Sequence, residues 1–531
     1  MDVLIKNALI IDGSGRPAFK GDLGIKNGKI VTDVTDKSAD SVIDAEGLCV
    51  SPGFIDAHSH GDGVYGTDFG RLCKISQGVT TEVCGQCGST FYPVSERTLP
   101  ELKELLSVIC PDFSPHVAEW KGLKEYKEYL KTVPLAANTA LFTGHSALRI
   151  AVMGFENRKA TPEELERMKD LLREAMEEGS LGMSSGLIYV PGSYADTDEL
   201  VELAKVLAPY DGIYATHMRN ESDHVVEAVR EALEIGRRAG VRVQISHHKA
   251  LGKKNWGLSR ETLALVDEAI ATGQRVTLDQ YPYEASMTHF NVLIPADFLS
   301  GGFDQSAQNL KDPAVRKMLK ERLSDESPDF ENYYQICGGF SGVYAAVLPD
   351  TPEYNGLFVS EIAERRDQDP FETYFDLVLA NHGKGTGIFF SMCEEDLCRI
   401  IRYPHTVVGS DGIVKAMREA GHPRGWATFP HAICYYHKQL GLMSLEEIIR
   451  RMTSLPAERL MLKGKGAIAD GMDADLVLFD YGKLADRATY ADSNALTEGI
   501  KTVIVNGQIV YKEKQLTGIY PGELILHHKS L

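Results

Sequence analysis

Short apolar runs alternate with amphipathic stretches along the middle of the chain. A short apolar run indicates a buried strand, and apolar positions three to four residues apart indicate a helix. Strands alternating with helices at this spacing predict a parallel sheet of the α/β class, and about eight such units favour a closed (β/α)8 barrel. Nine strands are candidates, so one lies outside the barrel or is not a strand. The predicted strands are 53–57, 80–83, 139–142, 181–185, 213–216, 242–246, 275–278, 387–390 and 406–408, and the clearest helices are 163–178, 225–239 and 260–272.

Both ends of the chain show another pattern, with short apolar runs joined by tight-turn sequences. Asn27-Gly28 and Asn506-Gly507 each separate two apolar runs, which is a strong hairpin signal. We therefore predict one small β domain built from residues 1–53 and 462–531, whose two parts lie close together in space. The barrel would then occupy residues 54–461.

Residues 286–341 interrupt the alternation of strands and helices after the seventh predicted strand. This segment is rich in Asp, Pro and Gly. Insertions at the carboxyl ends of barrel strands often form lids over an active site. We predict that the insertion lies near the active site, and a position far from Asp411 would contradict this.

Composition and charge narrow the possible partners. Of the 531 residues, 43% are hydrophobic and 25% are charged, which is typical of a globular chain with a substantial core. The net charge of −19 argues against nucleic acid and anionic membrane as partners, because both bind basic surfaces. No apolar run approaches the ~18–20 residues of a membrane span, and no signal-peptide pattern is present. Nine scattered cysteines form no disulfide framework, so we expect a cytoplasmic protein.

The strongest chemical motif is the sequence PGFIDAHSH at residues 52–60, which ends in His58 and His60. Residues i and i+2 of a strand lie on one face, so both imidazoles can reach one point at the end of the first strand. Barrel enzymes place their active sites at that end, and neutral imidazole is the commonest metal ligand. Two exposed loop histidines would give the same motif, so the motif alone does not decide.

Ligand-type residues also follow four other predicted strands. The strand ends of a closed barrel form one ring, so these side chains would converge on a single site. Agreement between five strands is far more specific than any one motif. The predicted metal ligands are His58, His60, Cys87, His217, His247 and Asp411.

Several neighbouring residues have simpler explanations. Cys84 and Cys87 form a Cys-x-x-Cys pair, but the contexts of a redox motif and of a zinc ribbon are both missing, so Cys84 is assigned to packing. His248 points to the opposite face of its strand from the ligand beside it, and His145 fits a pocket wall and a core position equally well. Asp56 lies deeper in the barrel than the first histidine. No second indicator supports His224, His289, His382, His405 or His437.

These motifs resemble those of the amidohydrolase superfamily, in the first-strand motif, in VIDAEG at residues 42–47 and in GKGAIA at 464–469. Other features are similar to the D-aminoacylase (N-acyl-D-amino-acid deacylase) family. They are a Cys in place of a carboxylated lysine, SHHK at 246–249, YPY at 281–283 and GSDG at 409–412 followed by HPR. The resemblance covers essentially the whole chain. It implies a distorted (β/α)8 TIM barrel, a small β-sandwich and an insertion near the active site.

The resemblance also implies a role for each matching residue. A tighter zinc site would use Cys87, His217 and His247. A weaker second site would use His58, His60 and Asp411, and Asp411 would be the catalytic acid/base. Substrate-contacting positions are matched by Lys249, Arg424, Tyr189 and either Tyr281 or Tyr283. Departures from the family at Gln86 and at residues 61–63 leave these ligands intact but bear on the acyl and side-chain preference.

The expected reaction is hydrolysis of N-acyl-D-amino acids. Bound zinc can lower the pKa of its water from about 15.7 toward about 7 and polarise the amide carbonyl. Asp411 could take the proton of that water and give it to the departing nitrogen. Lys249 and Arg424 would clamp the α-carboxylate, and a tyrosine would donate to the developing oxyanion. Surface salt bridges and pocket walls are the alternatives for these side chains.

Two other functions stay open. A carboxylated lysine at a strand end would favour a hydantoinase, dihydropyrimidinase or dipeptidase, whereas here Cys87 occupies the bridging position. A barrel without metal would be a non-catalytic assembly module, although all six ligand-type residues are retained. The expected partner is a small molecule, and we expect a monomer or a small homo-oligomer. The preference for D substrates comes from the resemblance alone.

Overall fold

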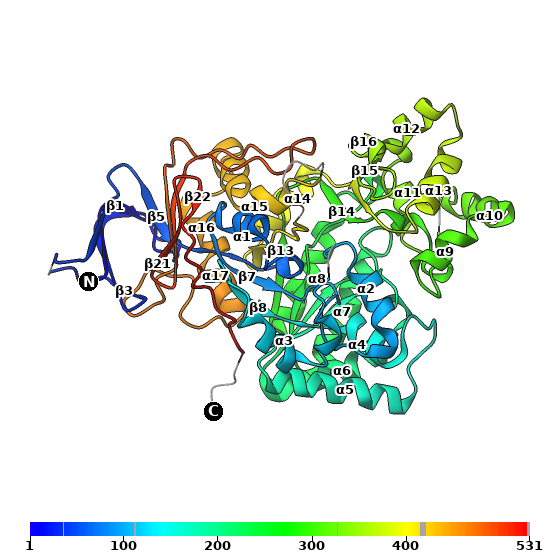
Figure 1. Cartoon of the computed structure of the whole chain (residues 1–531), viewed down its shortest axis with the longest axis horizontal. Coiled ribbons are helices and arrows are strands. Elements are labelled where there is room, and N and C mark those ends of the chain that lie inside the picture. The colour runs from blue at the N-terminus through cyan, green and yellow to red at the C-terminus, as the bar shows by residue number, and fades with distance from the viewer. Residues whose placement is uncertain (36, 111–112, 327, 415–420, 528–531) are drawn as a thin grey trace.

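The computed structural model describes residues 1–35, 37–110, 113–326, 328–414 and 421–527. Figure 1 shows three parts along the longest axis of the molecule. Blue N-terminal strands lie beside red C-terminal strands at one end, and parallel strands with surrounding helices fill the middle. A green to yellow-green part lies at the other end. A few residues of the predicted β domain, barrel and insertion lie outside the described residues: 36, 111–112, 327, 415–420 and 528–531.

Both ends of the chain contribute to one sheet, as their turn pattern predicts. Its strands are β1 (Val3–Ile10), β2 (Phe19–Lys26), β3 (Lys29–Val31), β4 (Ser41–Asp44), β5 (Cys49–Pro52), β19 (Leu476–Phe479), β20 (Ile500–Val505), β21 (Gln508–Lys512) and β22 (Gln515–Leu516). The order is β22-β21-β20-β19-β5-β1-β2-β3, and β4 pairs with β1. The two ends meet where β5 pairs antiparallel with β19. The division into domains and the sandwich form remain predictions.

The two Asn-Gly sequences form the predicted hairpin turns. Asn27 and Gly28 join β2 to β3 with φ angles of 52° and 74°, and Asn506 and Gly507 join β20 to β21 with 47° and 82°. Positive φ at both central residues is type I′ geometry, whose twist matches that of the flanking strands.

Eight of the nine predicted strands of the middle region lie in two parallel sheets. The smaller sheet contains β6 (Phe54–Asp56), β7 (Val79–Cys84) and β8 (Asn138–Leu141). The larger sheet contains β9 (Thr143–Gly144), β10 (Gly182–Gly186), β11 (Ile213–His217), β12 (Arg242–Ile245), β13 (Val276–Gln280) and β18 (Thr406–Val408). Its order is β18-β13-β12-β11-β10-β9, and every pairing is parallel.

The two parallel sheets approach each other on both sides. The chain passes directly from β8 into β9, and beside it the amide of Leu181, just before β10, donates to the carbonyl of Leu141 in β8 at 2.8 Å. On the other side the amide of Ala57 donates to the carbonyl of Val408 at 3.5 Å, a long hydrogen bond. The fold is therefore TIM-barrel-like, whereas full closure of the barrel stays a prediction.

The C-terminal segment occupies one edge of β8. Thr139 donates from its amide to the carbonyl of Glu523 at 2.9 Å and accepts at its carbonyl from the amide of Ile525 at 2.7 Å. These bonds use the backbone groups that a neighbouring barrel strand would otherwise pair with. Pairing with β10 therefore falls to β9, where the register begins at Thr143 opposite Met183. The C-terminal segment is thus a physical reason why β10 pairs with β9 and not with the start of β8.

Helices surround the parallel strands (Figure 1). The three predicted helices are α5 (Pro162–Glu177), α7 (Val225–Ala239) and α8 (Ser259–Ala271). A capping box between Thr161 and Glu164 starts α5, and α7 ends at Gly240 with a left-handed φ of 71°. The others around the strands are α1 (Asp68–Ile75), α2 (Leu99–Leu106), α3 (Leu123–Leu130), α4 (His145–Met153), α6 (Thr197–Ala204), α14 (Glu394–Arg402), α15 (Arg424–Ala432), α16 (Leu445–Met452) and α17 (Ser454–Arg459). Within the described ranges, no helix has the length and apolar character to cross a membrane.

The segment after β13 forms a separate sheet with its own helices, which we call the insertion. Its strands are β14 (Ala285–His289), β15 (Val343–Val347), β16 (Leu357–Phe358) and β17 (Thr386–Phe390), in the order β14-β17-β15-β16. Its helices are α9 (Phe303–Asn309), α10 (Pro313–Leu323), α11 (Tyr333–Ile336), α12 (Val359–Arg366) and α13 (Pro370–Ala380). The ninth predicted strand is β17, which pairs antiparallel here and not in the barrel. The inserted part thus extends beyond 286–341, to Phe390.

Candidate metal centre

The six predicted ligands lie at the carboxyl ends of five strands. His58 and His60 follow β6, Cys87 follows β7, His217 ends β11, His247 follows β12 and Asp411 follows β18. None of the six is more than 8% exposed. Parallel strands deliver all of these side chains to the same side of the fold, as the sequence predicts.

Four of these residues form a tight cluster of donor atoms. The Sγ of Cys87 lies 3.3 Å from Nε2 of His58 and 3.5 Å from Nε2 of His247. Oδ1 of Asp411 lies 3.5 Å from Nε2 of His58 and 3.2 Å from Nε2 of His60. Ligand atoms of His58, Cys87, His247 and Asp411 all lie within 4.8 Å of one another. Nitrogen, sulfur and oxygen donors gathered this closely suit a zinc ion.

His217 adds a buried imidazole beside this cluster. Its ring centroid lies 4.3 Å from that of His247. Neither ring nitrogen of His217 has a hydrogen-bond partner within the described part of the chain. Buried polar atoms are nearly always satisfied, so two orphaned nitrogens at this position are consistent with a metal ligand.

Three of the predicted ligands have a left-handed backbone. The φ angles are 53° at Cys87, 34° at His247 and 47° at Asp411. Residues other than glycine rarely adopt such angles, and each costs on the order of 1–3 kcal/mol. Strain at three members of one cluster indicates a site whose geometry the surrounding structure enforces.

The electrostatics of the cluster favour anionic ligands. Burial opposes ionisation of Asp411, but the charges of Arg424 and His247 outweigh it and hold the pKa of the carboxyl well below its ordinary value. Burial also opposes ionisation of Cys87, but the imidazoles of His58 and His247 hold the pKa of the thiol well below its ordinary value. A thiolate and a carboxylate are the charged ligands that a divalent cation requires.

The two predicted clamp residues are buried within the site, so surface salt bridges are excluded for them. Arg424 is 1% exposed, and its Nη1 lies 2.8 Å from Oδ2 of Asp411. Lys249 is 3% exposed, and its Nζ donates to both carboxylate oxygens of Glu221 at 2.8 Å. Both cations therefore stand beside the cluster, already paired with carboxylates of the chain.

The structure distinguishes the two candidate tyrosines of the YPY motif. The guanidinium of Arg424 lies 4.6 Å from the ring centroid of Tyr281, and Nζ of Lys249 lies 5.8 Å from it. The hydroxyl of Tyr281 is buried and lacks a hydrogen-bond partner among the described residues. Tyr283 instead stacks on His431 at 4.5 Å, so it is not gathered with the two cations.

Strand β14 of the insertion contacts residues of the site directly. Thr288 donates from its hydroxyl to the hydroxyl of Tyr189 at 2.9 Å, and the ring of Tyr189 lies 5.0 Å from that of His217. The carbonyl of Met287 accepts from Nη2 of Arg424 at 2.9 Å. The insertion therefore contacts residues of the predicted site.

Two buried carboxylates of the site were not predicted from the sequence. Asp279, in β13, is fully buried, and its Oδ1 lies 3.1 Å from Nδ1 of His58 and accepts from the amide of His247 at 2.8 Å. Glu221 is 1% exposed and contacts His217, His247 and Lys249. The signals in the sequence were an acidic residue within the apolar run VTLDQ and one four positions after a ligand histidine.

Other residues considered from the sequence have structural partners. His145 and Arg149 both bind Glu199. His145 therefore belongs to a buried ion-pair network, which answers the question of pocket wall or core position that the sequence left open. Cys84 accepts from the hydroxyl of Tyr65 at 3.1 Å, as expected of a packing residue. Nε2 of His248 lies 2.8 Å from the hydroxyl of Thr262, which is not among the partners of the adjacent His247.

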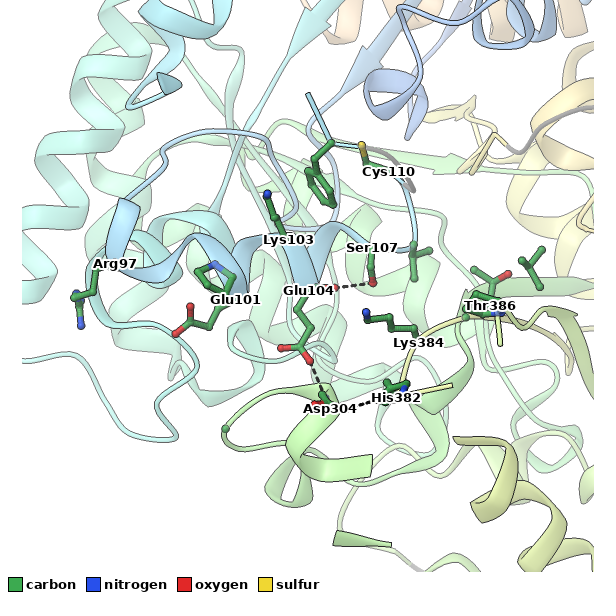
Figure 2. Close-up of a pocket in the computed structure, with 17 residues that line it drawn as sticks. Arg97, Glu101, Lys103, Glu104, Ser107, Cys110, Asp304, His382, Lys384 and Thr386 are labelled. Carbon is green, nitrogen blue, oxygen red and sulfur yellow. Dashed lines mark hydrogen bonds and ion pairs between the residues drawn. The ribbon is translucent and has the colours of Figure 1, made fainter. Parts of the chain in front are cut away.

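A separate groove of about 1070 Å³ lies between α2 and the insertion (Figure 2). Its charged groups are largely satisfied locally, since Asp304 pairs with His382 at 2.7 Å and its amide donates to Glu104 at 2.9 Å. None of the predicted site residues is among those that line it. The groove is therefore separate from the predicted site at the strand ends.

Comparison with known proteins places the chain in a family. The model of the Amidohydrolase family matches residues 41–322 and 360–511. The chain belongs to this amidohydrolase family. Over 526 aligned residues it is 36% identical to the D-aminoacylase of Alcaligenes xylosoxydans xylosoxydans. The alignment covers 99% of this chain and 97% of that protein.

Solved structures of amidohydrolases agree with this membership. The N-acyl-D-glutamate deacylase of Bordetella bronchiseptica, complexed with zinc and a phosphonate inhibitor, has a TM-score of 0.83 at 32% identity over 99% of both chains. A D-aminoacylase with a binuclear metal centre has a TM-score of 0.82 at 33% identity, again over 99% of both chains. The resemblance identified from the motifs is confirmed.

Proposed function

We propose that this amidohydrolase uses zinc to hydrolyse N-acyl-D-amino acids to a carboxylate and a free D-amino acid. The observation that carries the proposal is the set of six buried donor residues at the ends of five strands, with two buried cations beside them. The relatives named above, which match nearly the full length, include a D-aminoacylase and an N-acyl-D-glutamate deacylase. Two cations beside a metal centre suit a substrate that carries both an amide and a carboxylate.

Zinc fits the donors of the chain. Cys87, His217 and His247 would hold the tighter ion, and His58, His60 and Asp411 would form a weaker second site. The low pKa of the Cys87 thiol and the orphaned nitrogens of His217 both support this assignment. Bound zinc would activate a water molecule and polarise the amide carbonyl.

Asp411 is the proposed acid and base. Its carboxylate lies within the donor cluster, where it is placed to take a proton from a water molecule held there. Arg424 occupies Oδ2, whereas Oδ1 faces the ligand histidines. We assign the proton taken from water to Oδ1, from where it passes to the departing amine nitrogen.

Arg424, Lys249 and Tyr281 are the proposed substrate contacts at the clamp, together with Tyr189. The Nε of Arg424 is buried without a hydrogen-bond partner in the described structure, so its guanidinium retains a donor for the α-carboxylate. The unpartnered hydroxyl of Tyr281 is suited to donate to the developing oxyanion. Tyr283 belongs to the wall behind them.

We further propose that the two parallel sheets form one distorted (β/α)8 barrel over residues 54–461, beside a β-sandwich built from 1–53 and 462–531. The continuous run from β8 into β9 supports a single ring of strands. The hydrogen bond between Ala57 and Val408 supports the same ring on the other side.

The test is release of free amino acid from matched N-acetyl-D- and N-acetyl-L-amino acids by the zinc-loaded protein. The panel contains methionine, leucine, phenylalanine, glutamate and aspartate. We expect release from D forms only, and the ranking identifies the preferred side chain. Release from neither series would overturn the proposal, and equal release from both would overturn the D preference.

A further inference from the structure

Glu221 is a buried carboxylate that the proposed reaction does not yet use. It follows β11 and lies four residues after His217. Its Oε1 lies 3.1 Å from Nδ1 of His247, and its Oε2 lies 3.5 Å from Nε2 of His217. At 1% exposed, it has no access to bulk water that could compensate its charge. A buried carboxylate placed against two metal-ligand histidines requires a reason.

The contact with His247 determines which ring nitrogen carries the proton. Nε2 of His247 faces the Sγ of Cys87 at 3.5 Å, so Nε2 is the atom that would bind zinc and must keep its lone pair. The hydrogen then resides on Nδ1, from which it is donated to Oε1 of Glu221. A carboxylate in this position fixes the tautomer and ring orientation of a ligand histidine and increases its basicity.

The same carboxylate also fixes Lys249. Nζ of Lys249 lies 2.8 Å from each oxygen of Glu221. Nζ of Lys249 also lies 2.7 Å from Nδ1 of His247, but an ammonium only donates, so once Nδ1 carries the hydrogen both nitrogens donate to Glu221 and not to each other. One side chain therefore sets the position of a proposed metal ligand and of a proposed substrate clamp.

Backbone contacts hold Glu221 in place from two directions. Its amide donates to Oε1 of Glu331 in the insertion at 2.5 Å. Its carbonyl accepts from the amide of Leu251 at 2.7 Å. The loop that carries Glu221 is thus anchored to the insertion and to the chain just after Lys249, so the carboxylate has little freedom to move.

We infer that Glu221 is a positioning residue that acts on the metal through His247 and on the substrate through Lys249, an inference that rests on the proposed zinc-dependent function. A direct ligand role is the competing explanation, because donor atoms of His217, Glu221 and His247 also lie within 4.8 Å of one another. Two contacts favour positioning. Both oxygens already bind Lys249, and Oε1 meets the nitrogen of His247 that faces away from Cys87.

The test compares zinc affinity and steady-state kinetics of the wild type and Glu221→Gln. Affinity is measured by competition with a chromogenic chelator, without substrate. We expect zinc to bind about 10- to 100-fold more weakly in E221Q, which is the usual effect of losing such a partner. We also expect a higher KM, because Lys249 loses its anionic partner. In the cobalt-substituted protein, the visible spectrum should keep the coordination number of the wild type.

Glu199→Gln is a matched control. Glu199 is also a buried carboxylate, which accepts from His145 at 2.9 Å and from Arg149 at 2.6 Å, and neither partner is a proposed ligand. E199Q should lose stability but retain wild-type zinc affinity. Glu221→Asp keeps the charge with a shorter reach, so it should recover part of the zinc affinity that E221Q loses.

The possible outcomes separate this inference from the proposed function. Wild-type zinc affinity in E221Q overturns the inference, as does an equal loss in E221Q and E199Q. A reduced coordination number in cobalt-substituted E221Q makes Glu221 a ligand and also overturns it. A wild type that binds zinc but releases no amino acid overturns the proposed function alone.

Discussion

Asp411 has a different partner at each of its oxygens. Oδ2 meets the guanidinium of Arg424 at 2.8 Å, and Oδ1 meets the imidazoles of His58 and His60. The backbone at this residue is left-handed, which turns the carboxylate from the end of β18 toward the donor cluster. Such a backbone costs stability, so the surrounding structure holds this carboxylate in a strained position beside the donor cluster.

At this scale we predict the effect of Asp411→Asn. The amide cannot accept and return a proton, so kcat should fall by roughly 10²- to 10⁴-fold. Zinc in the tighter site should remain, because Cys87, His217 and His247 are unchanged. Measuring metal content after dialysis alongside turnover separates the two effects. Wild-type turnover in this variant would assign the proton transfer to another group.

The residues of the candidate site divide by how their role arises. His58, His60 and Cys87 were predictable because strand periodicity and the ring of strand ends determine where they point. Glu221 and Asp279 were not, because their role depends on loops and strands that only the folded chain brings together. The left-handed backbone of three ligands likewise has no sequence signal of the kind that glycine provides.

Among the elements, the strands of the middle region show that hydrophobic periodicity locates strands but does not assign each strand to its sheet. Eight predicted strands lie in the parallel sheets, whereas residues 387–390 form β17 of the insertion. Four of the five residues of β17 are buried, so its apolar pattern equals that of a barrel strand. An apolar run indicates that both faces of a strand are buried, but it does not indicate whether the neighbouring strand is parallel or antiparallel. The full extent of the insertion was hidden for the same reason.

Helices α4 and α6 are joined by a buried ion pair whose effect should depend on pH. Burial raises the pKa of Glu199 on α6, but hydrogen bonds from His145 and Arg149 and the charge of Arg149 on α4 outweigh it and lower the pKa to about 2. A depressed carboxyl pKa stabilises the fold above the unfolded pKa, and this contribution is lost as pH falls toward about 2. A shift of this size is worth on the order of 3 kcal/mol.

We therefore predict that Glu199→Gln is less stable than the wild type at pH 7. The difference in stability between the two proteins should decrease steadily between about pH 4.5 and pH 2. Thermal midpoints of both proteins, measured by circular dichroism across this range without zinc, provide the test. A difference in thermal midpoint that stays constant down to pH 3 would show that Glu199 and Arg149 do not stabilise the fold through their charges.

For the whole molecule, the donor cluster connects the two parallel sheets. His58 and Cys87 follow strands of the smaller sheet, and His217, His247 and Asp411 follow or end strands of the larger one. On the side of β6 and β18, backbone hydrogen bonds from Ala57 to Val408, from Asp411 to His58 and from His60 to Gly412 already link the two sheets. A bound metal would add a further link between the two sheets at this side and should stabilise the fold as a whole.

Removing zinc should consequently lower the melting temperature of the wild type. At a free zinc concentration 100 times the Kd, binding contributes about 2.7 kcal/mol, which corresponds to several degrees in a chain of this kind. Cys87→Ala lacks a proposed ligand of the tighter site, so chelator should leave its melting temperature almost unchanged. Differential scanning fluorimetry of both proteins with and without chelator measures this. An equal shift in both would place the stabilising ion elsewhere.

The pairing of β5 with β19 makes this fold dependent on the order of synthesis. As the chain leaves the ribosome, β5 emerges before the entire barrel, whereas β19 emerges after it. Until then, β5 exposes an unpaired edge of backbone groups next to the strand that begins the barrel. Open edges of this kind pair readily with other chains. A nascent chain stalled before residue 476 would therefore be a substrate for chaperones, and the last strands made would release it.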